Sequence, residues 1–307
     1  MIYASAAELI GNTPLMRADR FCKALGLTAT ILVKLESHNP GGSSKDRIAL
    51  NMIQAAEQRG TLKPGATLIE STSGNTGVGL GVVAAARGYH VVLTMPDNMS
   101  LERRKILAAL GVEIVLTEGA RGMAGANAKA EELKNSIPNS VWMLQFDNPD
   151  NPAAHEATTG PEIWRDAEGH VDVLVAGVGT GGTVSGTGRY LKRQNPSVRV
   201  IAVQPAESPV LTGGMANSHG IQGIGANFVP KNFDRNAVDE IMSITTADSL
   251  EMARLFMKTE GILCGISSGA ALVAAVESAR ETGMDRANIV AILPDTGERY
   301  LSTQLFD

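Results

Sequence analysis

The sequence has few of the features expected of secreted, membrane or metal-binding proteins. Only two of its 307 residues are cysteines, Cys22 and Cys264, which are too few for a disulfide framework and lack the spacing of a metal site. No apolar run approaches the roughly 20 residues that a membrane helix needs. We therefore expect a cytoplasmic protein with no bound metal and no membrane association.

Aromatic residues and positive charge are also scarce. Aromatics make up 4% of the chain and form no stacking array, and the formal net charge is -5 at pH 7, which argues against nucleic acid as a partner. The first residues, MIYASAAELIGNT, have no basic residue before Arg17 and no long apolar core, so we expect no signal peptide there.

Short apolar runs with β propensity alternate with segments of helical period along the whole chain. The expected strands cover residues 29–36, 66–71, 90–96, 112–119, 141–146, 171–178, 198–204 and 288–294. The expected helices cover residues 46–59, 76–87, 100–110, 122–135, 154–167, 183–193, 247–260 and 268–281. Several strands are continuous Val/Ile/Leu runs, as expected for strands covered on both faces. The pattern predicts an α/β protein with mostly parallel sheet.

The length of 307 residues predicts about two domains. The turn cluster DNPDNP, at 147–152, is the best candidate for a boundary near the midpoint. We therefore expect an N-terminal α/β domain over 1–147 and a C-terminal α/β domain over 148–307. Residues 205–235 have weak periodicity and much Gly, Pro and Asn, which predicts a long surface or active-site loop.

Glycine, serine and threonine gather at three strand-to-helix corners: GGSSK (41–45), STSGNTG (71–77) and GVGTGGTVSGTG (177–188). Glycine lets backbone amides approach a ligand, and the first turn of the following helix points free N–H groups and a positive dipole end at it. Each corner is therefore a candidate anion cradle. The alternative for any single corner is a tight βα turn.

The third corner also spells the dinucleotide fingerprint G-x-G-x-x-G, with Gly177, Gly179 and Gly182. That fingerprint wants an acidic residue about 20 positions on, at the end of the next strand, to hold a ribose hydroxyl. Here that strand ends in Gln204, which weakens the case for a nicotinamide-dependent dehydrogenase. A P-loop fits no better, because Lys45 lacks the G-x-x-x-x-G-K-[ST] frame.

The remaining features are a phosphate site, a second anion site and Lys45 at the lip of a helix, with no metal ligands and no nucleophile triad. The five histidines, which we interpret as surface or packing residues, are His38, His90, His155, His170 and His219. A lysine near a phosphate cradle can pair with charge or form a Schiff base. Pyridoxal phosphate would use both features at once.

The sequence resembles the cysteine synthases, or O-acetylserine sulfhydrylases, of the fold-type II pyridoxal-phosphate enzymes. The motifs that carry the resemblance are IGNTPL (10–15), NPGGSSKDR (39–47), TSGNTG (72–77), MPDNMSLERRK (95–105), TTGPEIW (158–164), GVGTGGT (177–183), IQGIGANF (221–228), GISSGAA (265–271) and GERYLST (297–303). The resemblance implies two open, twisted, mostly parallel sheets flanked by helices, as in the tryptophan synthase β subunit. It also implies that an early N-terminal segment packs on the second domain.

The resemblance implies pyridoxal 5'-phosphate as cofactor, bound by Lys45, Asn75, Gly179, Thr180, Gly181, Gly182, Thr183 and Ser267. Lys45 would hold it covalently, which accounts for one amine at so tight a corner. The segment from Gly179 to Thr183 would cradle the phosphate, and Asn75 would hydrogen-bond the ring oxygen. Ser267 would face the ring nitrogen, where a hydroxyl leaves the pyridine largely unprotonated and favours β-elimination over transamination.

The substrate-binding residues that the resemblance implies are Thr72, Ser73, Gly74, Asn75, Thr76, Gln145 and Gly225. Thr72 to Thr76, together with Gln145, would bind the substrate carboxylate. Gly225 would line the mouth of the active-site cleft. Lys45 would remove the α-proton as general base. Acetate would then leave O-acetyl-L-serine, and sulfide would add to the β-carbon to give L-cysteine. Carboxylate binding would close the smaller domain and exclude water.

Several alternatives stay open within the resemblance. The same chemistry with other partners would make cystathionine or lanthionine, or would break cysteine down and release sulfide. The resemblance further implies a homodimer, and a cleft that can accept the C-terminal tail of serine acetyltransferase, so that the chain could act mainly as a binding partner. Asp295 stands where A-type enzymes usually have serine, whereas IQGIGANF is A-type. Asp295 would either tune the cofactor ring or cap the following turn.

Overall fold

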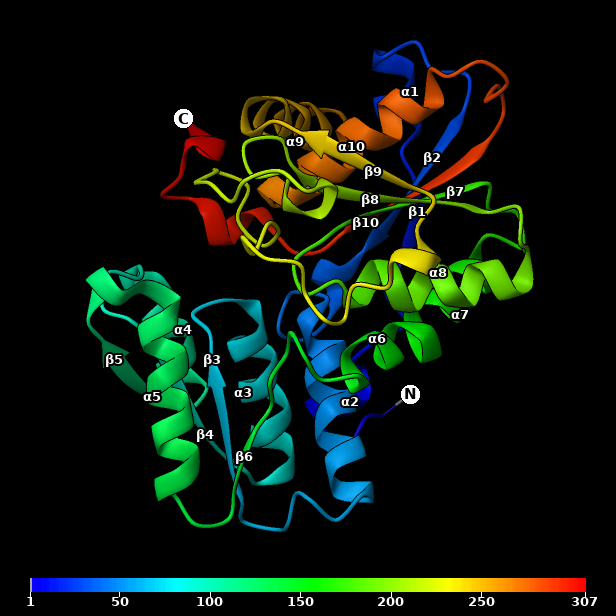
Figure 1. The fold of residues 1–307 in the computed structure, drawn as a ribbon. Coiled ribbons are helices and arrows are strands. Elements are labelled where there is room, and N and C mark those ends of the chain that lie inside the picture. The colour runs from blue at the N-terminus through cyan, green and yellow to red at the C-terminus, as the bar shows by residue number, and fades with distance from the viewer. Residues whose placement is uncertain (1) are drawn as a thin grey trace. The chain divides into compact units, whose positions relative to one another are not determined.

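The computed structural model describes residues 2–307, which divide into two compact units. Unit 1 comprises the described residues up to Ile10 together with Asn39–Asn151, and unit 2 comprises Gly11–His38 and Pro152–Asp307. A segment close to the N-terminus thus belongs to the same unit as the second half of the chain. Figure 1 shows the elements of each unit, coloured along the sequence.

Unit 1 is built on a four-stranded parallel sheet in the order β5-β4-β3-β6. Its strands are β3 (Thr67–Ser71), β4 (His90–Pro96), β5 (Glu113–Thr117) and β6 (Ser140–Trp142). Its helices are η1 (Ala6–Leu9), α2 (Lys45–Gln58), α3 (Asn75–Arg87), α4 (Leu101–Ala109), η3 (Gly119–Arg121) and α5 (Gly122–Ser136). Leu68 and Ile69 of β3 are both fully buried, as expected for a parallel strand with helices on both faces.

Unit 2 is built on a six-stranded sheet in the order β1-β2-β10-β7-β8-β9, in which only the edge strand β1 runs antiparallel to its neighbour. Its strands are β1 (Leu15–Arg17), β2 (Thr30–Leu35), β7 (Val173–Gly177), β8 (Arg199–Pro205), β9 (Glu240–Ile244) and β10 (Asn288–Leu293). Its main helices are α1 (Asp19–Ala24), α7 (Gly160–Asp166), α8 (Gly182–Gln194), α9 (Thr246–Glu260) and α10 (Ile266–Ala279).

The shorter helices complete the chain. They are η2 (Glu36–His38), the π-helical turn η4 (His155–Thr159), η5 (Val210–Thr212), η6 (Arg235–Ala237), η7 (Gly297–Tyr300) and η8 (Gln304–Phe306), with α6 (Asp150–Ala154) spanning the point in the chain where unit 1 passes to unit 2. None of the described helices is both long and apolar enough to span a bilayer.

The sheet of unit 2 has an apolar core on each face. Successive strand residues point to opposite sides, so Val33 joins one core and Leu32 the other. Helices α9 and α10 lie on the first face, and α7 and α8 lie on the second (Figure 1). This doubly covered arrangement leaves the carboxyl ends of the strands for loops.

The predicted fold class is confirmed: both sheets are mostly parallel and flanked by helices. The predicted strand over 141–146 is too long, because β6 ends at Trp142 and Leu144 takes a positive φ of 52°. The prediction did not include β1, α1 or β9. The predicted helix over 154–167 is divided into α6, η4 and α7.

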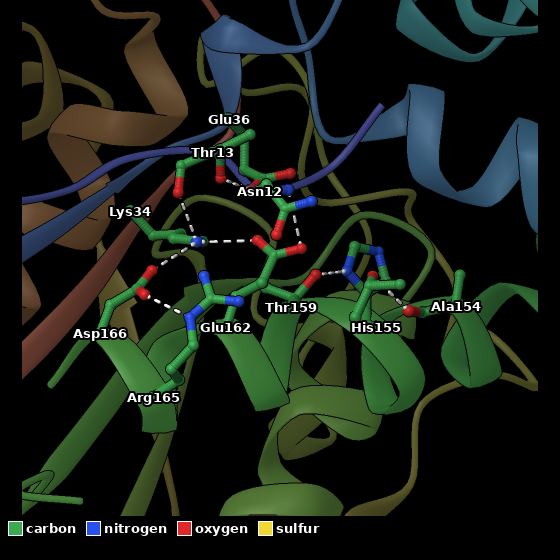
Figure 2. A network of polar contacts seen from close by, with 11 residues as sticks. Asn12, Thr13, Lys34, Glu36, Ala154, His155, Thr159, Glu162, Arg165 and Asp166 are labelled. Atoms are coloured by element: carbon green, nitrogen blue, oxygen red, sulfur yellow. Dashed lines mark hydrogen bonds and ion pairs between the residues drawn. The ribbon is translucent and has the colours of Figure 1, made fainter. Parts of the chain in front are cut away.

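A buried polar network anchors the N-terminal segment of unit 2 to α7 (Figure 2). The Lys34 ammonium is fully buried, donates to the Thr13 carbonyl at 2.6 Å and lies 2.8 Å from Oε2 of Glu162. The other oxygen of Glu162 accepts from the Asn12 backbone N–H at 2.9 Å. The Thr13 hydroxyl donates to Glu36 at 2.7 Å. Asn12 and Thr13 of the IGNTPL motif are therefore bound within unit 2 through their polar groups.

Candidate active site

Lys45 is the first residue of α2, directly after the glycine corner. Its Nζ lies 3.4 Å from Oγ of Ser44, and the residue is half-buried. A Cβ on Gly41 would lie 2.5 Å from Oδ1 of Asp46, so a side chain at residue 41 would force the Asp46 carboxylate, which accepts from the Gly41 N–H, to move. The corner therefore fixes the backbone from which the amine projects.

Helix α3 packs closely on the lysine helix through another glycine. A Cβ on Gly79 would lie 2.9 Å from the backbone oxygen of Lys45, a distance that side chains essentially never reach. The residue must therefore be glycine for α2 and α3 to approach this closely. As a result, the start of α3 and the loop before it belong to the same rigid packing as Lys45.

The loop Thr72–Thr76 connects the carboxyl end of β3 to α3 and lies at the amino end of that helix. The Thr72 hydroxyl accepts from the Gly74 N–H at 3.1 Å, which shapes the loop into a tight turn. The Thr76 hydroxyl donates to Oε1 of Gln145 at 2.6 Å. The structure thus brings Gln145, predicted as a further donor, against the loop, although the two are far apart in the chain.

Glu70 is a buried carboxyl two residues before this loop, and it was not among the predicted site residues. Its oxygens accept from the N–H groups of Ser71 and Gln145, at 3.0 and 3.1 Å. Burial raises the pKa of Glu70 to about 7, against the lowering effect of surrounding N–H groups, those of Gln145 first. Only its position next to the glycine corner could have singled it out in the sequence.

The corner after β7, where the phosphate cradle was expected, lies in unit 2. Gly181 has a φ of +83°, and a Cβ there would lie 2.8 Å from Cα of Phe233. A Cβ on Gly179 would lie 2.4 Å from the backbone oxygen of Gly223. Glycine is therefore required at both positions for the loop to turn into α8, whose first N–H groups and positive dipole end lie at this corner.

Ser267 lies in the first turn of α10 and is 2% exposed. A Cβ on Gly223 would lie 3.6 Å from Oγ of Ser267, an ordinary van der Waals distance, so Gly223 lies directly beside that hydroxyl. Gly225, the expected mouth residue, has a φ of +69° and donates its N–H to the carbonyl of Val178 at 3.0 Å. Within unit 2 the loop around Gly223 therefore links the cradle to Ser267.

A histidine also contacts the cradle. His155, which we interpreted as a surface or packing residue, is 1% exposed and lies in the π-helical turn η4. Its Nε2 is 3.2 Å from Oγ1 of Thr183, one of the predicted phosphate ligands.

Asp295 is buried next to the start of α10. Oδ2 of Asp295 accepts from the Tyr300 hydroxyl at 2.7 Å, and a Cβ on Gly265 would lie 2.1 Å from Oδ1. The N-cap of the following turn η7 is Thr296, whose side chain accepts from the Glu298 N–H, while Asp295 contacts the same turn through Tyr300. Burial, with a smaller contribution from Asp295, raises the pKa of Cys264 to about 12, which keeps that thiol protonated.

The residues fit a phosphorylated aldehyde better than a metal or a dinucleotide. Among residues 2–307, no three His, Cys, Asp or Glu side chains are placed to hold a metal ion. The last two residues of β8 are Gln204 and Pro205, so no carboxylate stands there to bind a ribose. The Gln204 amide donates to the hydroxyls of Thr212 and Ser243 at 3.0 Å each. Unit 1 offers one amine and the hydroxyls of the Thr72–Thr76 loop, and unit 2 offers a glycine-rich corner at a helix end and the Ser267 hydroxyl.

The chain is similar to known enzymes over its whole length. The family model described as pyridoxal-phosphate dependent enzyme matches residues 6–295. Cysteine synthase A of Escherichia coli (strain K12) is 52% identical, with 99% of this chain and 96% of that protein covered.

Solved structures agree with this similarity. The structure of cysteine synthase from Entamoeba histolytica matches with a TM-score of 0.97 and 45% identity, covering 100% of this chain and 91% of that one. A hydrogen sulfide-producing enzyme from Fusobacterium nucleatum matches with a TM-score of 0.92 and 41% identity, covering 98% and 100%.

Proposed function

Because the chain belongs to the family of pyridoxal-phosphate-dependent enzymes, and within it to the cysteine synthases, we propose that it makes L-cysteine from O-acetyl-L-serine and sulfide with release of acetate. The observation that carries this proposal is the similarity to cysteine synthase A over nearly the whole chain. The cofactor of the family is pyridoxal 5'-phosphate.

The side chains and loops described above suit this cofactor. Lys45 would hold its aldehyde, Asn75 its ring oxygen and Ser267 its ring nitrogen. The phosphate would lie on the cradle formed by Gly179, Thr180, Gly181, Gly182 and Thr183. When bound, pyridoxal phosphate supplies an electron sink that weakens the Cα–H bond of an amino acid and allows a β-substituent to leave.

The substrate carboxylate is held in unit 1. The hydroxyls and N–H groups of the Thr72–Thr76 loop, at the amino end of α3, favour an anion, and Gln145 adds an amide from the segment that follows β6. The Nζ atom of Lys45 removes the α-proton, a step for which a positioned base contributes roughly 10² to 10⁴ in rate. Ser267 presents a neutral hydroxyl, which favours loss of the β-substituent over transamination.

The test is product formation by the purified, cofactor-loaded protein. Given O-acetyl-L-serine and sulfide, it should release cysteine and acetate in equal amounts. Given cysteine alone, it should release sulfide much more slowly. Rapid sulfide release with negligible cysteine formation would overturn the proposal.

Lys45→Ala tests the base and anchor together. We expect kcat to fall at least about 10³-fold, because the substitution removes both the amine that would bind the cofactor covalently and the group that accepts the α-proton. The exposed Lys63→Ala in the same unit is the matched control and should keep wild-type activity. Unfolding by urea should be similar for all three proteins, and retained turnover in Lys45→Ala would contradict the assigned role.

Release of sulfide from cysteine is the second candidate function. It is favoured by the 41% identity to a hydrogen sulfide-producing enzyme over nearly the full chain. Synthesis of cystathionine or lanthionine uses the same site with a thiol as second nucleophile. Product analysis with sulfide, cysteine and homocysteine as competing nucleophiles separates these reactions.

The family resemblance further supports a homodimer, a cytoplasmic location and binding of the C-terminal tail of serine acetyltransferase. Both cysteines are buried and free, in keeping with a reducing compartment. Light scattering of the purified protein tests the dimer. A peptide with the sequence of that tail should compete with O-acetyl-L-serine, and a peptide lacking the terminal carboxylate should not.

A further inference from the structure

Glu70 is the second-to-last residue of strand β3, just before the Thr72–Thr76 loop, and is only 2% exposed. Both of its carboxylate oxygens are used on backbone groups: Oε1 accepts from the N–H of Ser71 and Oε2 from the N–H of Gln145. Ser71 directly precedes the Thr72–Thr76 loop. Gln145 contacts the same loop through the hydroxyl of Thr76. A single carboxylate therefore holds the two backbone segments that together form the expected carboxylate site.

The segment before Gln145 needs such support. Strand β6 ends at Trp142, and Leu144 takes a φ of +52°, a conformation that L side chains rarely adopt. The backbone of Gln145 is held on both sides, because its N–H donates to Glu70 and its carbonyl accepts from Nδ2 of Asn151 at 2.7 Å. With the backbone held, the side chain reaches the Thr76 hydroxyl.

We propose that Glu70 is a positioning residue for substrate recognition, whose carboxylate fixes Gln145 and the start of the Thr72–Thr76 loop in the geometry that receives the α-carboxylate of the amino acid. The inference rests on the proposed function, which assigns the loop and Gln145 to that carboxylate. Glu70 itself touches neither substrate nor cofactor in this role and acts through its two backbone partners.

The burial of Glu70 supports a role beyond packing. Its neighbours on the same strand, Leu68 and Ile69, are apolar and fully buried, so an apolar residue would fit the sheet. A buried carboxyl is costly unless its oxygens are hydrogen-bonded. The groups that offset burial here are N–H groups, those of Gln145 and Ser71 foremost, and none is a cation. The indole N–H of Trp142 contributes to this offset but makes no hydrogen bond of ordinary geometry.

The experiment measures binding of L-alanine, an amino acid with the α-carboxylate and no leaving group, to the cofactor-loaded protein by the change in visible absorbance. Glu70→Gln keeps the size of the side chain but has one oxygen acceptor fewer, so one of the two N–H groups loses its partner. We expect the Kd for L-alanine to rise about tenfold. The Kd for L-alaninamide, which has no carboxylate, should not change. Glu70→Asp serves as a second variant and should also bind L-alanine more weakly.

Two comparisons separate positioning from general structural damage. Gln145→Ala and the double variant Glu70→Gln/Gln145→Ala should bind L-alanine almost equally, because Glu70 acts in large part through Gln145. The amide hydrogen of Gln145 should exchange faster in Glu70→Gln than in wild type. Glu260→Gln is the matched control, since Glu260 accepts the N–H of Phe21 at 2.7 Å in unit 2, and it should change neither result.

The outcomes discriminate between the inference and the function on which it rests. Wild-type affinity for L-alanine in both Glu70 variants, or fully additive losses in the double variant, would overturn the inference. An equal loss of affinity for L-alanine and L-alaninamide would do the same, because it would point to general damage. Failure of the wild-type protein to make cysteine while it binds L-alanine would overturn only the proposed function.

Discussion

In unit 2, Nε2 of His155 lies 3.2 Å from the hydroxyl of Thr183, and Nδ1 lies 2.9 Å from the hydroxyl of Thr159. The imidazole therefore connects η4 to the first turn of α8, where the expected phosphate cradle ends. This contact links a residue that we interpreted as packing to the expected binding of the cofactor.

We predict that His155→Ala weakens pyridoxal phosphate binding about tenfold, because the Thr183 hydroxyl loses the partner that orients it. The measurement is a fluorescence titration of the cofactor-free protein. His170→Ala, an exposed histidine of the same unit, is the control and should bind the cofactor as the wild type does. An unchanged Kd in His155→Ala would show that the hydroxyl needs no orientation.

A pair of glycines separates backbone strain from steric conflict in the cradle. Gly181 and Gly213 have nearly the same φ, +83° and +84°, but only at Gly181 would a Cβ meet backbone, with Phe233 Cα at 2.8 Å. Gly213→Ala should cost about 1 kcal/mol of unfolding free energy from φ alone. Gly181→Ala should cost about 1 to 3 kcal/mol more because the Phe233 backbone must move. Urea denaturation measures both, and equal losses would refute the close approach.

The pKa of Glu70 predicts a pH dependence of stability. Burial raises this pKa from 4.5 to about 7 in the folded protein. The folded state therefore holds a proton that the unfolded state releases, and stability falls as pH rises from 4.5 through 7. The loss attributable to Glu70 is about 3 kcal/mol across this window.

Glu70→Gln, which does not titrate, should remove that part of the pH dependence. Unfolding free energies of both proteins, measured by denaturant at several pH values across the window, give the difference. If the two proteins lose stability in parallel as the pH rises, Glu70 has an ordinary pKa.

The network of Figure 2 predicts a strong coupling between Lys34 and Glu162. Lys34→Met should destabilise unit 2 by about 3 to 5 kcal/mol, because it leaves a buried carboxylate without its cation. Lys34→Met/Glu162→Gln should recover part of this loss, since the amide oxygen can still accept from the Asn12 N–H.

The exposed pair Arg17 and Asp19, with side chains 67% and 65% exposed, is the control for this cycle. Arg17→Met should change stability by less than about 1 kcal/mol. If the losses of unfolding free energy in Lys34→Met and in Glu162→Gln add in full in the double variant, the ion pair contributes nothing to stability.

The alternation of strands and helices could be predicted because most of these strands are parallel and doubly covered, so that their sequences are continuous apolar runs. The elements that were missed lack this signal. β1 is three residues long and α1 six, too short for a period to show, and β9 lies at the sheet edge, where Glu240 and Ser243 interrupt the apolar run.

The extent of β6 depended on a contact that no local pattern contains. The residues after Trp142 leave the strand because Leu144 takes a positive φ, and Gln145 is held there by Glu70, which is 75 residues away in the chain. The same limitation hid His155, whose partner Thr183 is 28 residues away.

The sequence by itself determined the fold class and the positions of the three glycine corners, because these follow from local periodicity and from the conformational freedom of glycine. Only the tertiary structure decided which buried polar groups hold those corners in place: Glu70 on Gln145, His155 on Thr183 and Lys34 on Glu162. The physical reason is that a buried polar group must find its partner in space, and a chain that folds back on itself brings together residues that its order keeps apart.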